Sequence, residues 1–332
     1  MDIAVLGTGA FGTAWARLLA HRGHQVTWWA RRPEIAAQIA RTRESPHLPG
    51  VDLPEGIEVI SDLAAAVSGK RFVLSVTPSH AIREVLGQAA PLLAEDAVVV
   101  NASKGIEEGT LATVDAIYQE ILPAGHFARA AYLSGPTFAK ELAAGLPAAI
   151  VVASHDGDSA MAVQAQFATD RLRVYTTEDV IGVELGGALK NVVAIGAGIA
   201  DGLGFGHNTR AMLITRGLSE MARLGAKLGA NPMTFAGLAG IGDLVLTCTG
   251  DLSRNRQLGL ELGRGKTLAE LLAGTTSVVE GVKTARAAHA LATRVGVDMP
   301  IAAAINAILH EGKSPRQAVT ELMTRDLKPE RS

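Results

Sequence analysis

The stretch "IAVLGTGAFG", residues 3–12, decides how the amino-terminal part of the chain folds. Gly7, Gly9 and Gly12 have the spacing GxGxxG, directly after an apolar strand-like run and before a helix-like segment. The first glycine allows a tight turn, the second lets a pyrophosphate approach the backbone, and the third lets helix and strand pack closely. A plain tight turn is the alternative, but the strand before and the helix after favour a dinucleotide-binding unit.

Further apolar runs continue the pattern of this first unit. Buried strands are predicted at residues 3–7, 25–29, 57–60, 72–76, 97–101, 131–134 and 149–154. Helix-like segments lie between several of them, at Ala10–His21, Pro33–Thr42 and Ser79–Ala90. This alternation is typical of a doubly wound α/β fold, so we expect a Rossmann-type amino-terminal domain with a parallel-rich sheet.

The strand signal disappears after about residue 180. Segments with helical spacing follow at 182–200, 208–229, 281–295, 299–309 and 315–323. We therefore expect two domains: a dinucleotide-binding domain at residues 1–181 and an all-α substrate-binding domain at residues 182–332.

Composition excludes several classes of protein. The 332 residues carry 31 Lys and Arg against 33 Asp and Glu, and this balance predicts no nucleic-acid partner. Cys248 is the only cysteine, no signal peptide is apparent, and no uninterrupted apolar run is long enough to span a membrane, so the expected location is the cytoplasm. The nine histidines show no metal-ligand spacing, and no metal is predicted.

The end of the second strand bears on the choice of cofactor. NAD-specific sites usually have an acidic residue there, whereas this chain has Arg31 and Arg32. A guanidinium can pair with a 2′-phosphate, so NADP(H) is favoured, while NAD(H) is still allowed. Alternatively, both arginines are solvent-exposed surface charges.

Lys190 is the only charged residue between Glu184 and Asp201, on an apolar glycine-rich stretch. Burying an ammonium there is costly unless a partner or a pKa shift relieves it. A lysine with a lowered pKa can act as an acid and a base near neutral pH. The alternative is a helix lysine that extends its side chain to water. Glu184 and Asn191 are near enough in sequence to orient it, although Asn191 would face another way.

Three polar stretches are candidates for the rest of the site. "SGPTFAKE", residues 134–141, and "NASKGI", residues 101–106, each follow a strand, where ligands bind in open α/β sheets. A bare turn with a helix cap at Thr137 is the other interpretation of the first. "GIGDLVLTCTGDLSRNRQLG", residues 240–259, gathers hydrogen-bond donors suited to a small phosphorylated or polyhydroxylated ligand. Taken alone, this stretch fits a polar loop between the domains equally well. Cys248 lies in an apolar part of it and is expected to be a buried structural thiol.

Together these stretches resemble the NAD(P)-dependent glycerol-3-phosphate dehydrogenases. The similar segments run in order from residue 3 to about residue 325, and they are "GTGAFGTA" (7–14), "NASKGIE" (101–107), "LSGPTFAKELAAGLP" (133–147), "ALKNVVAIGAGIADGL" (188–203), "NTRAMLITRG" (208–217), "GIGDLVLTCTGDLSRNRQLG" (240–259) and "SVVEGVKTA" (277–285). The resemblance implies reversible reduction of dihydroxyacetone phosphate to sn-glycerol 3-phosphate, the backbone of glycerophospholipids. It also implies a homodimer.

The resemblance also implies roles for individual residues. Lys190 would transfer the proton, Lys104 would touch substrate and cofactor, and Asp243 and Thr247 would belong to the active-site polar set. Substrate contacts would come from Gly135, Thr137, Ser253, Arg254 and Asn255. Cofactor contacts would come from Ala10, Phe11, Arg31, Ala139, Arg254, Val278 and Glu280. His207 stands where the family often has an acid, so its role is open.

Two other functions compete with this one. A hydroxyacid or 6-phosphogluconate-type dehydrogenase would also have a helical second half, but the cluster from Asp243 to Asn255 argues against it. A non-catalytic NADP-binding regulator is the second, and the presence of Lys104 and Lys190 argues against that.

Overall fold

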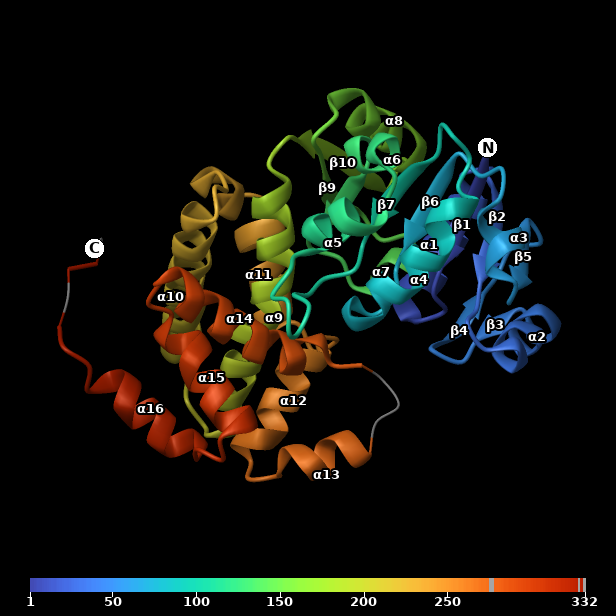
Figure 1. The fold of residues 1–332 in the computed structure, drawn as a ribbon. Helices are drawn as coiled ribbons and strands as arrows, with labels where there is room; N and C mark the ends of the chain where they lie inside the picture. Colours follow the sequence, from blue (N-terminus) through green and yellow to red (C-terminus); the bar gives the residue numbers. More distant parts are fainter. Residues whose placement is uncertain (275–277, 328, 331–332) are drawn as a thin grey trace.

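The computed structural model describes residues 1–274, 278–327 and 329–330. An eight-stranded sheet and its helices form the amino-terminal half, on the right in Figure 1, and a helical bundle forms the carboxyl-terminal half, on the left. The strands of the large sheet are β1 (Asp2–Leu6), β2 (Gln25–Trp29), β5 (Ile57–Ile60), β6 (Phe72–Ser75), β7 (Val98–Asn101), β8 (Ala131–Ser134), β9 (Ala148–Ser154) and β10 (Leu172–Thr177).

The sheet has the order β10-β9-β8-β7-β6-β1-β2-β5. All neighbouring pairs are parallel except β8 and β9, so the last two strands run against the other six. The expected parallel-rich sheet is confirmed. The chain leaves β1 for β2 on one side and returns to β6 on the other, and the crevice at such a reversal is where α/β sheets bind ligands.

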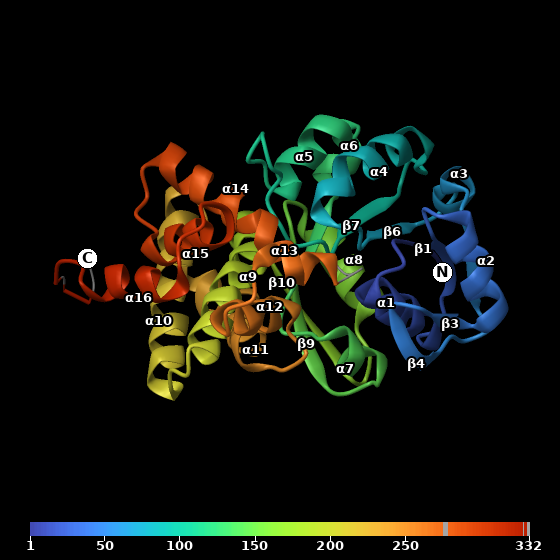
Figure 2. The ribbon, with the colours of Figure 1, turned by 90° about the horizontal axis from the view of Figure 1, so that it is seen from below.

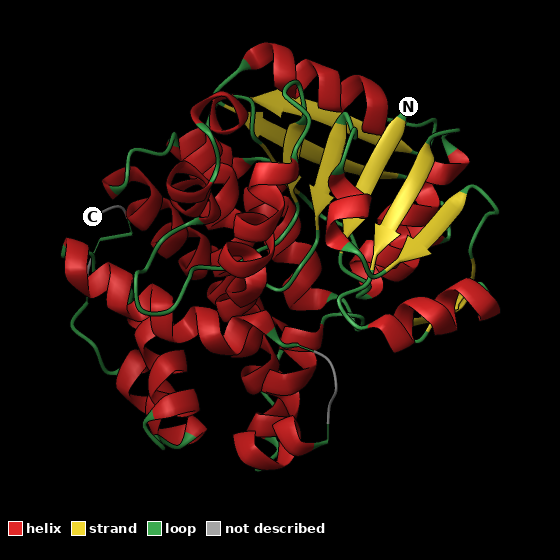
Figure 3. Ribbon diagram, turned by 45° about the vertical axis from the view of Figure 1, so that its right-hand side comes forward, coloured by secondary structure: helices red, strands yellow, loops and turns green. Residues whose placement is uncertain are grey.

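Helices cover both faces of the sheet, as Figure 3 shows. The apolar strands pack against α1, α7 and α8 on one face and against α3, α4, α5 and the start of α9 (Val180–Gly202) on the other. The helices of this half are α1 (Ala10–His21), α2 (Pro33–Thr42), α3 (Leu63–Val67), α4 (Ile82–Ala89), α5 (Val114–Ile121), α6 (Ala124–Ala128), α7 (Ala139–Ala143) and α8 (Gly157–Phe167), with short turns η1 (Ser79–Ala81) and η2 (Ala90–Leu92).

Every strand predicted from the sequence is present, and three further strands are not among those predictions. A small hairpin, β3 (Glu44–Ser45) and β4 (Leu48–Asp52), interrupts the alternation, and β10 occupies the segment that the sequence indicated as a turn between domains. Only Leu172 and Val174 of β10 are buried, because β10 is an edge strand, and so its apolar signal is weak.

In the carboxyl-terminal half, the described residues beyond Thr177 contain helices and turns but no strand, so the all-α expectation is confirmed for them. The helices are α9 (Val180–Gly202), α10 (His207–Lys227), α11 (Asp243–Thr249), α12 (Arg254–Gly263), α13 (Leu268–Ala273), α14 (Glu280–Val295), α15 (Pro300–His310) and α16 (Pro315–Met323), with a 3-10 turn η3 (Pro232–Ala236) and a π turn η4 (Leu238–Gly242). The short helices α11, α12 and α13 were not predicted.

Helix α9 is the core of this half, and Figure 2 shows it among α10, α11, α12 and α14. Among the described helices it alone is long and apolar enough to cross a membrane. However, 89% of its apolar window is buried inside the molecule, so it also fits a core helix. The residue of interest on it, Lys190, is buried as well.

Candidate active site

A cleft of about 720 Å³ lies where the carboxyl ends of the parallel strands face the helical half. Both halves of the chain line it. It brings together most of the residues that the sequence singled out, namely Gly7, Gly9, Ala10, Phe11, Arg31, Arg32, Lys104, Thr137, Ala139, Lys190, Thr247, Ser253, Arg254, Asn255, Val278 and Glu280. Gly12, Gly135 and Asp243 are not part of this lining, but Gly12 packs against Gly7, and Gly135 and Asp243 bind Lys104. His207 is exposed at the start of α10, outside the described lining.

The glycine fingerprint forms one end of the cleft. A Cβ atom on Gly12 would lie well under 3.0 Å from the carbonyl oxygen of Gly7, so only glycine lets α1 approach β1 this closely. A Cβ on Gly9 would meet nothing within 4 Å, which leaves its backbone open to the cleft. No side chain caps α1, so its first N–H groups are free to bind an anion such as a pyrophosphate.

Cationic side chains line the wall beside β2. Arg31 and Arg32 both face the cleft, and Arg31 pairs with Glu84 of α4 at 2.7 Å, with both side chains more than half exposed. His47, from the β3–β4 hairpin, lines the same wall. Burial lowers the pKa of His47, and the charges of Arg32 and Arg254 lower it further. Sequence reasoning missed His47, because a two-residue strand leaves no apolar period to indicate the hairpin.

The floor of the cleft holds two lysines that share one carboxylate. Lys190 Nζ lies 2.5 Å from Asp243 Oδ1, and Lys104 Nζ lies 2.6 Å from Asp243 Oδ2. Asp243 is fully buried, and Lys190 Nζ also donates to Thr247 Oγ1 at 2.9 Å. Lys190 comes from α9, Lys104 from the loop after β7, and Asp243 and Thr247 from one face of α11. Lys190 therefore has a buried partner, and the alternative of a side chain extended to water is wrong.

The burial and the charges set the protonation of these groups. Burial lowers the pKa of Lys190 to about 8; the Asp243 carboxylate opposes this, and the Lys104 ammonium adds to it. Burial alone would raise the pKa of Asp243, but the two lysines outweigh it and hold the pKa below its usual value. Asp243 is thus a carboxylate near neutral pH, while Lys190 can be an ammonium or an amine.

Other groups were expected to orient Lys190. Glu184 does not face it: its Oε1 atom accepts a hydrogen bond from the backbone N–H of Asp115, at the start of α5. Asn191 faces another way, as expected: it points toward α12, where its Oδ1 atom accepts from Asn255 Nδ2 at 2.9 Å. Sequence proximity was misleading here, because the orienting groups Asp243 and Thr247 lie more than 50 residues along the chain from Lys190.

The "SGPTF" loop lies beside Lys104. The carbonyl oxygen of Gly135 accepts from Lys104 Nζ at 3.3 Å, and the hydroxyl of Thr137 lies 3.4 Å from the same oxygen. The residue at the cap position of α7 is Phe138, so the alternative in which Thr137 caps this helix is wrong.

The segment from Ser253 to Asn255 lines the cleft from the helical half. It is the start of α12 rather than a polar loop: Ser253 Oγ accepts from the N–H of Arg256, and Arg254 is the first helical residue. Asn255 is held on both sides, because its Oδ1 atom accepts from Gly281 N at 3.0 Å. Cys248 on the neighbouring α11 is buried as expected, and burial raises the pKa of its thiol to about 12.

A contact between the halves closes the edge of the cleft. Glu280, the first residue of α14, accepts hydrogen bonds from Ser79 Oγ at 2.6 Å and from Ser79 N at 3.2 Å. The loop that contains Ser79 follows β6 and also supplies Thr77, Pro78 and His80 to the cleft. Sequence reasoning missed this loop, although its place at the end of a central strand was a usable signal.

The arrangement combines an anion-binding turn, a buried acid–base lysine and a polar helix start with an arginine. Such a site can bind a dinucleotide and a small phosphorylated carbonyl compound side by side and exchange a proton with its oxygen. Within the described residues, no three His, Cys, Asp or Glu side chains group as metal ligands.

The chain is similar to known proteins over nearly its whole length. The models described as NAD-dependent glycerol-3-phosphate dehydrogenase N-terminus and C-terminus match residues 2–160 and 179–320. The glycerol-3-phosphate dehydrogenase (NAD(P)+) of Geobacter sp. strain M21 is 55% identical over 99% of this chain and 98% of its own length. The corresponding enzyme of Geobacter sulfurreducens is 54% identical over 99% of this chain and 98% of its own length. The crystal structure of glycerol-3-phosphate dehydrogenase from Coxiella burnetii is 38% identical, with a TM-score of 0.92 over 98% of this chain and 99% of that one.

Proposed function

The chain belongs to the family of NAD-dependent glycerol-3-phosphate dehydrogenases, and we infer that it reduces dihydroxyacetone phosphate to sn-glycerol 3-phosphate with NADPH or NADH, reversibly. The single observation that carries this function is the buried group of Lys104, Asp243 and Lys190, between the glycine fingerprint and the start of α12. The product is the backbone of glycerophospholipids, so the enzyme is proposed to supply lipid synthesis.

The residues at the fingerprint end fit a nicotinamide dinucleotide. The open backbone at Gly9 and the uncapped N-terminus of α1 suit its pyrophosphate. Further contacts are proposed for Ala10, Phe11, Ala139, Val278 and Glu280, all of which line the cleft. When bound, the cofactor supplies the hydride that is added to the carbonyl carbon.

Lys190 is proposed to move the proton. In the reduction its ammonium donates a proton to the carbonyl oxygen of the substrate and becomes an amine. In the oxidation the amine takes the proton of the hydroxyl. A pKa of about 8 supports both directions, because both forms are populated near neutral pH.

The neighbouring groups are proposed to hold Lys190 in place and to balance its charge. Asp243 fixes both lysines, and its carboxylate keeps the pKa of Lys190 from falling further. Thr247 accepts from Lys190 and orients Nζ. Lys104, the more exposed lysine, adds positive charge beside the carbonyl oxygen as negative charge develops there.

The start of α12 is proposed to bind the phosphate. Arg254 is exposed to the cleft, while Ser253 and Asn255 are oriented by backbone and side-chain partners. A guanidinium can grip a phosphate with two parallel hydrogen bonds. Gly135 and Thr137 would contact the rest of the substrate, next to Lys104.

Arg31 and Arg32 support a preference for the phosphorylated cofactor, and we propose that NADPH is used at least as well as NADH. Both line the cleft at the end of β2, with no acidic residue at that position. The partner of Arg31, Glu84, is exposed and can release it at small cost.

We further propose the domain limits, the assembly and the location. Strand β10 ends at Thr177 and α9 begins at Val180, which supports a dinucleotide-binding domain at 1–181 and a substrate-binding domain at 182–332. The protein is proposed to act as a cytoplasmic homodimer. Sedimentation velocity measures its mass in solution, and a species of one chain at micromolar concentration would contradict the dimer.

The function is tested by steady-state assay of the pure protein with dihydroxyacetone phosphate and each reduced cofactor. A hydroxyacid and 6-phosphogluconate serve as alternative substrates, assayed as oxidations with NADP+. In parallel, Arg254→Lys is expected to raise KM for dihydroxyacetone phosphate about tenfold, since hydrogen bonds to charged groups contribute about 1.5–3 kcal/mol. It should also reduce discrimination against unphosphorylated dihydroxyacetone. Turnover only with another substrate would contradict the function, and unchanged discrimination would place the phosphate elsewhere.

A further inference from the structure

A buried ion cluster lies behind the start of α12, away from the described lining of the cleft. Arg256 donates from Nε at 3.0 Å and from Nη2 at 2.8 Å to Asp201 Oδ2. Arg210 donates from Nε at 3.0 Å and from Nη2 at 2.7 Å to Asp201 Oδ1. The Asp201 side chain is 8% exposed and that of Arg256 is 10% exposed, so this carboxylate is the buried centre of the cluster.

The cluster joins the end of α9 to the first turn of α12. Asp201 is near the last residue of α9, while Arg256 lies two residues after Arg254. Arg256 also donates from Nη1 to Asp251, whose side chain is 89% exposed. With two arginines and two aspartates the cluster is neutral, but only Asp201 supplies buried negative charge.

The backbones of the two helices are in direct contact along the same seam. Gly198 and Gly202 of α9 face Gly259 and Gly263 of α12, and a Cβ atom on any of them would lie well under 3.0 Å from a backbone atom of the other helix. Such contact fixes the distance between the helices. The seam reaches the first turn of α12, because a Cβ on Gly198 would meet the carbonyl oxygen of Arg256. The Arg256 side chain holds the same turn to Asp201, while Arg254 and Asn255 precede this contact.

We propose that Asp201, acting through Arg256, is the positioning residue for the phosphate-binding turn of α12. The proposal rests on the function proposed above. Among the described residues no hydrogen bond holds the Arg254 guanidinium, although the charge of Glu280 acts on it. Its position therefore depends on the backbone of the first turn of α12. Asn255 fixes the turn from the cleft side through Asn191 and Gly281, and the Asp201–Arg256 pair fixes it from behind.

Asp201→Asn tests this assignment, because asparagine keeps the shape but removes the charge that holds Arg256. KM for dihydroxyacetone phosphate is expected to rise at least about tenfold, since small displacements of positioning groups cost up to 10²-fold. Turnover at saturating substrate should stay within about threefold, because Lys190 and Asp243 are held by other contacts. NADPH affinity should change much less than KM, since the fingerprint that suits the pyrophosphate lies in the other half of the chain.

Two matched variants separate positioning from general stability. Arg210→Met removes the second arginine and leaves the Asp201–Arg256 pair, and Asp251→Asn removes only the exposed partner. Both should leave KM within about twofold even if the melting temperature falls, because neither removes the hydrogen bonds between Arg256 and Asp201. A rise of KM in Arg210→Met equal to that in Asp201→Asn would overturn the proposal.

Arg256→Lys keeps a charge but loses the planar fork, so it decides the question if Asp201→Asn does not fold. It should show an intermediate rise of KM, and an unchanged KM would overturn the proposal. Calorimetric titration with glycerol 3-phosphate gives a readout that needs no turnover. If the wild-type protein binds glycerol 3-phosphate but reduces no dihydroxyacetone phosphate, the proposed function fails. The effect of Asp201→Asn on glycerol 3-phosphate affinity still tests the positioning role of Asp201.

Discussion

Lys190 is held where both of its protonation states are accessible. Burial and Lys104 favour the amine, Asp243 favours the ammonium, and the balance sets its pKa at about 8. As the acid of the reduction Lys190 must be protonated. The rate of reduction should therefore fall as the pH rises through about 8, and the rate of oxidation should rise over the same range.

Lys190→Met keeps the stem of the side chain and removes the ammonium. Turnover should fall by about 10²–10⁴-fold, which is the usual contribution of positioned proton transfer. Stopped-flow and steady-state rates between pH 6 and 10, with NADPH affinity measured by fluorescence, check both effects. Near-normal turnover would exclude the acid–base role, and joint loss of fold and cofactor binding would indicate a structural lysine.

Arg31 bears on the choice between the two cofactors. Arg31→Ala should weaken NADPH binding by about tenfold and leave NADH unchanged, because only the 2′-phosphate can use this guanidinium. Arg22→Ala, at another exposed arginine in the same half, is the control. Dissociation constants for both cofactors decide the matter, and an equal loss for both would show that Arg31 makes no 2′-phosphate contact.

At the scale of elements, the α9–α12 pair connects the acid–base lysine to the phosphate-binding turn. Their seam of glycines brings the two backbones together, and Arg256 and Asn255 extend the contact toward the cleft. A change in this seam therefore affects the substrate more than the cofactor.

Gly259→Ala tests the seam, because its Cβ would lie well under 3.0 Å from Ile195 O of α9. We expect a loss of about 1–3 kcal/mol of stability, as for other overpacked sites, and a higher KM for dihydroxyacetone phosphate with a much smaller change in NADPH affinity. Gly157→Ala, in the open at the start of α8, should be neutral or slightly stabilising. Thermal unfolding and KM measure both, and a neutral Gly259→Ala would show that the helices can separate freely.

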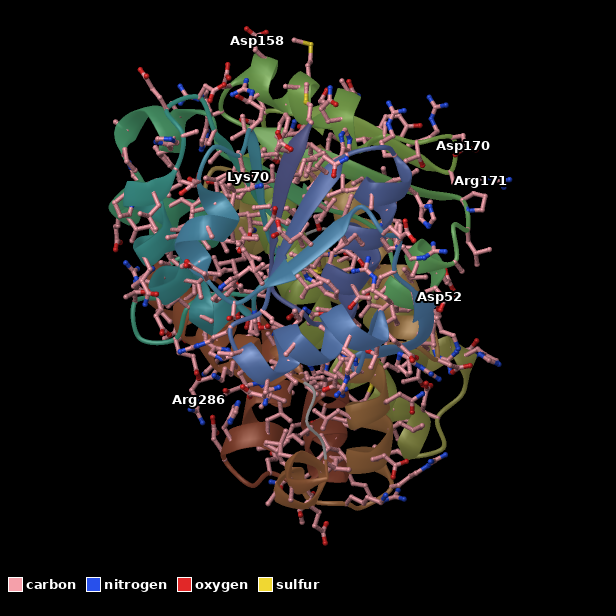
Figure 4. The ribbon with its side chains drawn as sticks, turned by 90° about the vertical axis from the view of Figure 1, so that its right-hand side faces the viewer. Asp52, Lys70, Asp158, Asp170, Arg171 and Arg286 are labelled. Atoms are coloured by element: carbon pink, nitrogen blue, oxygen red, sulfur yellow. The ribbon has the colours of Figure 1, made fainter. Side chains whose placement is uncertain are left out.

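At the scale of the whole molecule, α14 and α9 tie the two halves together around the cleft. Glu280 of α14 binds Ser79, Arg294 donates to Thr110 O at 3.2 Å, and Arg286, labelled at the surface in Figure 4, lies 3.6 Å from Glu108. Glu184 of α9 binds the start of α5, within the sheet half. Both halves must be folded for the site to exist.

Glu184 makes this junction sensitive to pH. Burial raises its pKa to about 8, and Asp115 adds to the shift, while Tyr118 and Tyr132 lie close to it. A carboxyl with a raised pKa in the folded state stabilises the fold below its unfolded pKa of about 4.5 and loses that contribution as the pH rises to about 8.

Glu184→Gln should remove this loss, because glutamine reproduces the neutral carboxyl and one of the two oxygens has no partner among the described residues. The variant should melt a few degrees higher than the wild type at pH 9 and equally at pH 5. Differential scanning fluorimetry across this range tests it, with the exposed Glu55→Gln as control. A constant difference at all pH values would mean that Glu184 does not titrate in this range.

Local patterns in the sequence determined most of the secondary structure of this protein and the position of its glycine fingerprint. The period of apolar residues and the GxGxxG spacing predicted the strands, the main helices and the fingerprint, because each depends on neighbours within one turn or one strand. Short elements with weak periods, the β3–β4 hairpin, β10 and α11 to α13, were not predicted. The motifs also indicated which residues belong to the site, and most of them line the cleft.

Only the tertiary structure decided how these residues work together. The partners of Lys190 are Asp243 and Thr247, which lie 53 and 57 residues along the chain, and not its sequence neighbours Glu184 and Asn191. Arg256 and Asp201, and likewise Glu280 and Ser79, are partners that lie far apart in the sequence. Burial, charge pairing and the resulting pKa depend on distances in space, and the packing of α9, α11 and α12 sets these distances.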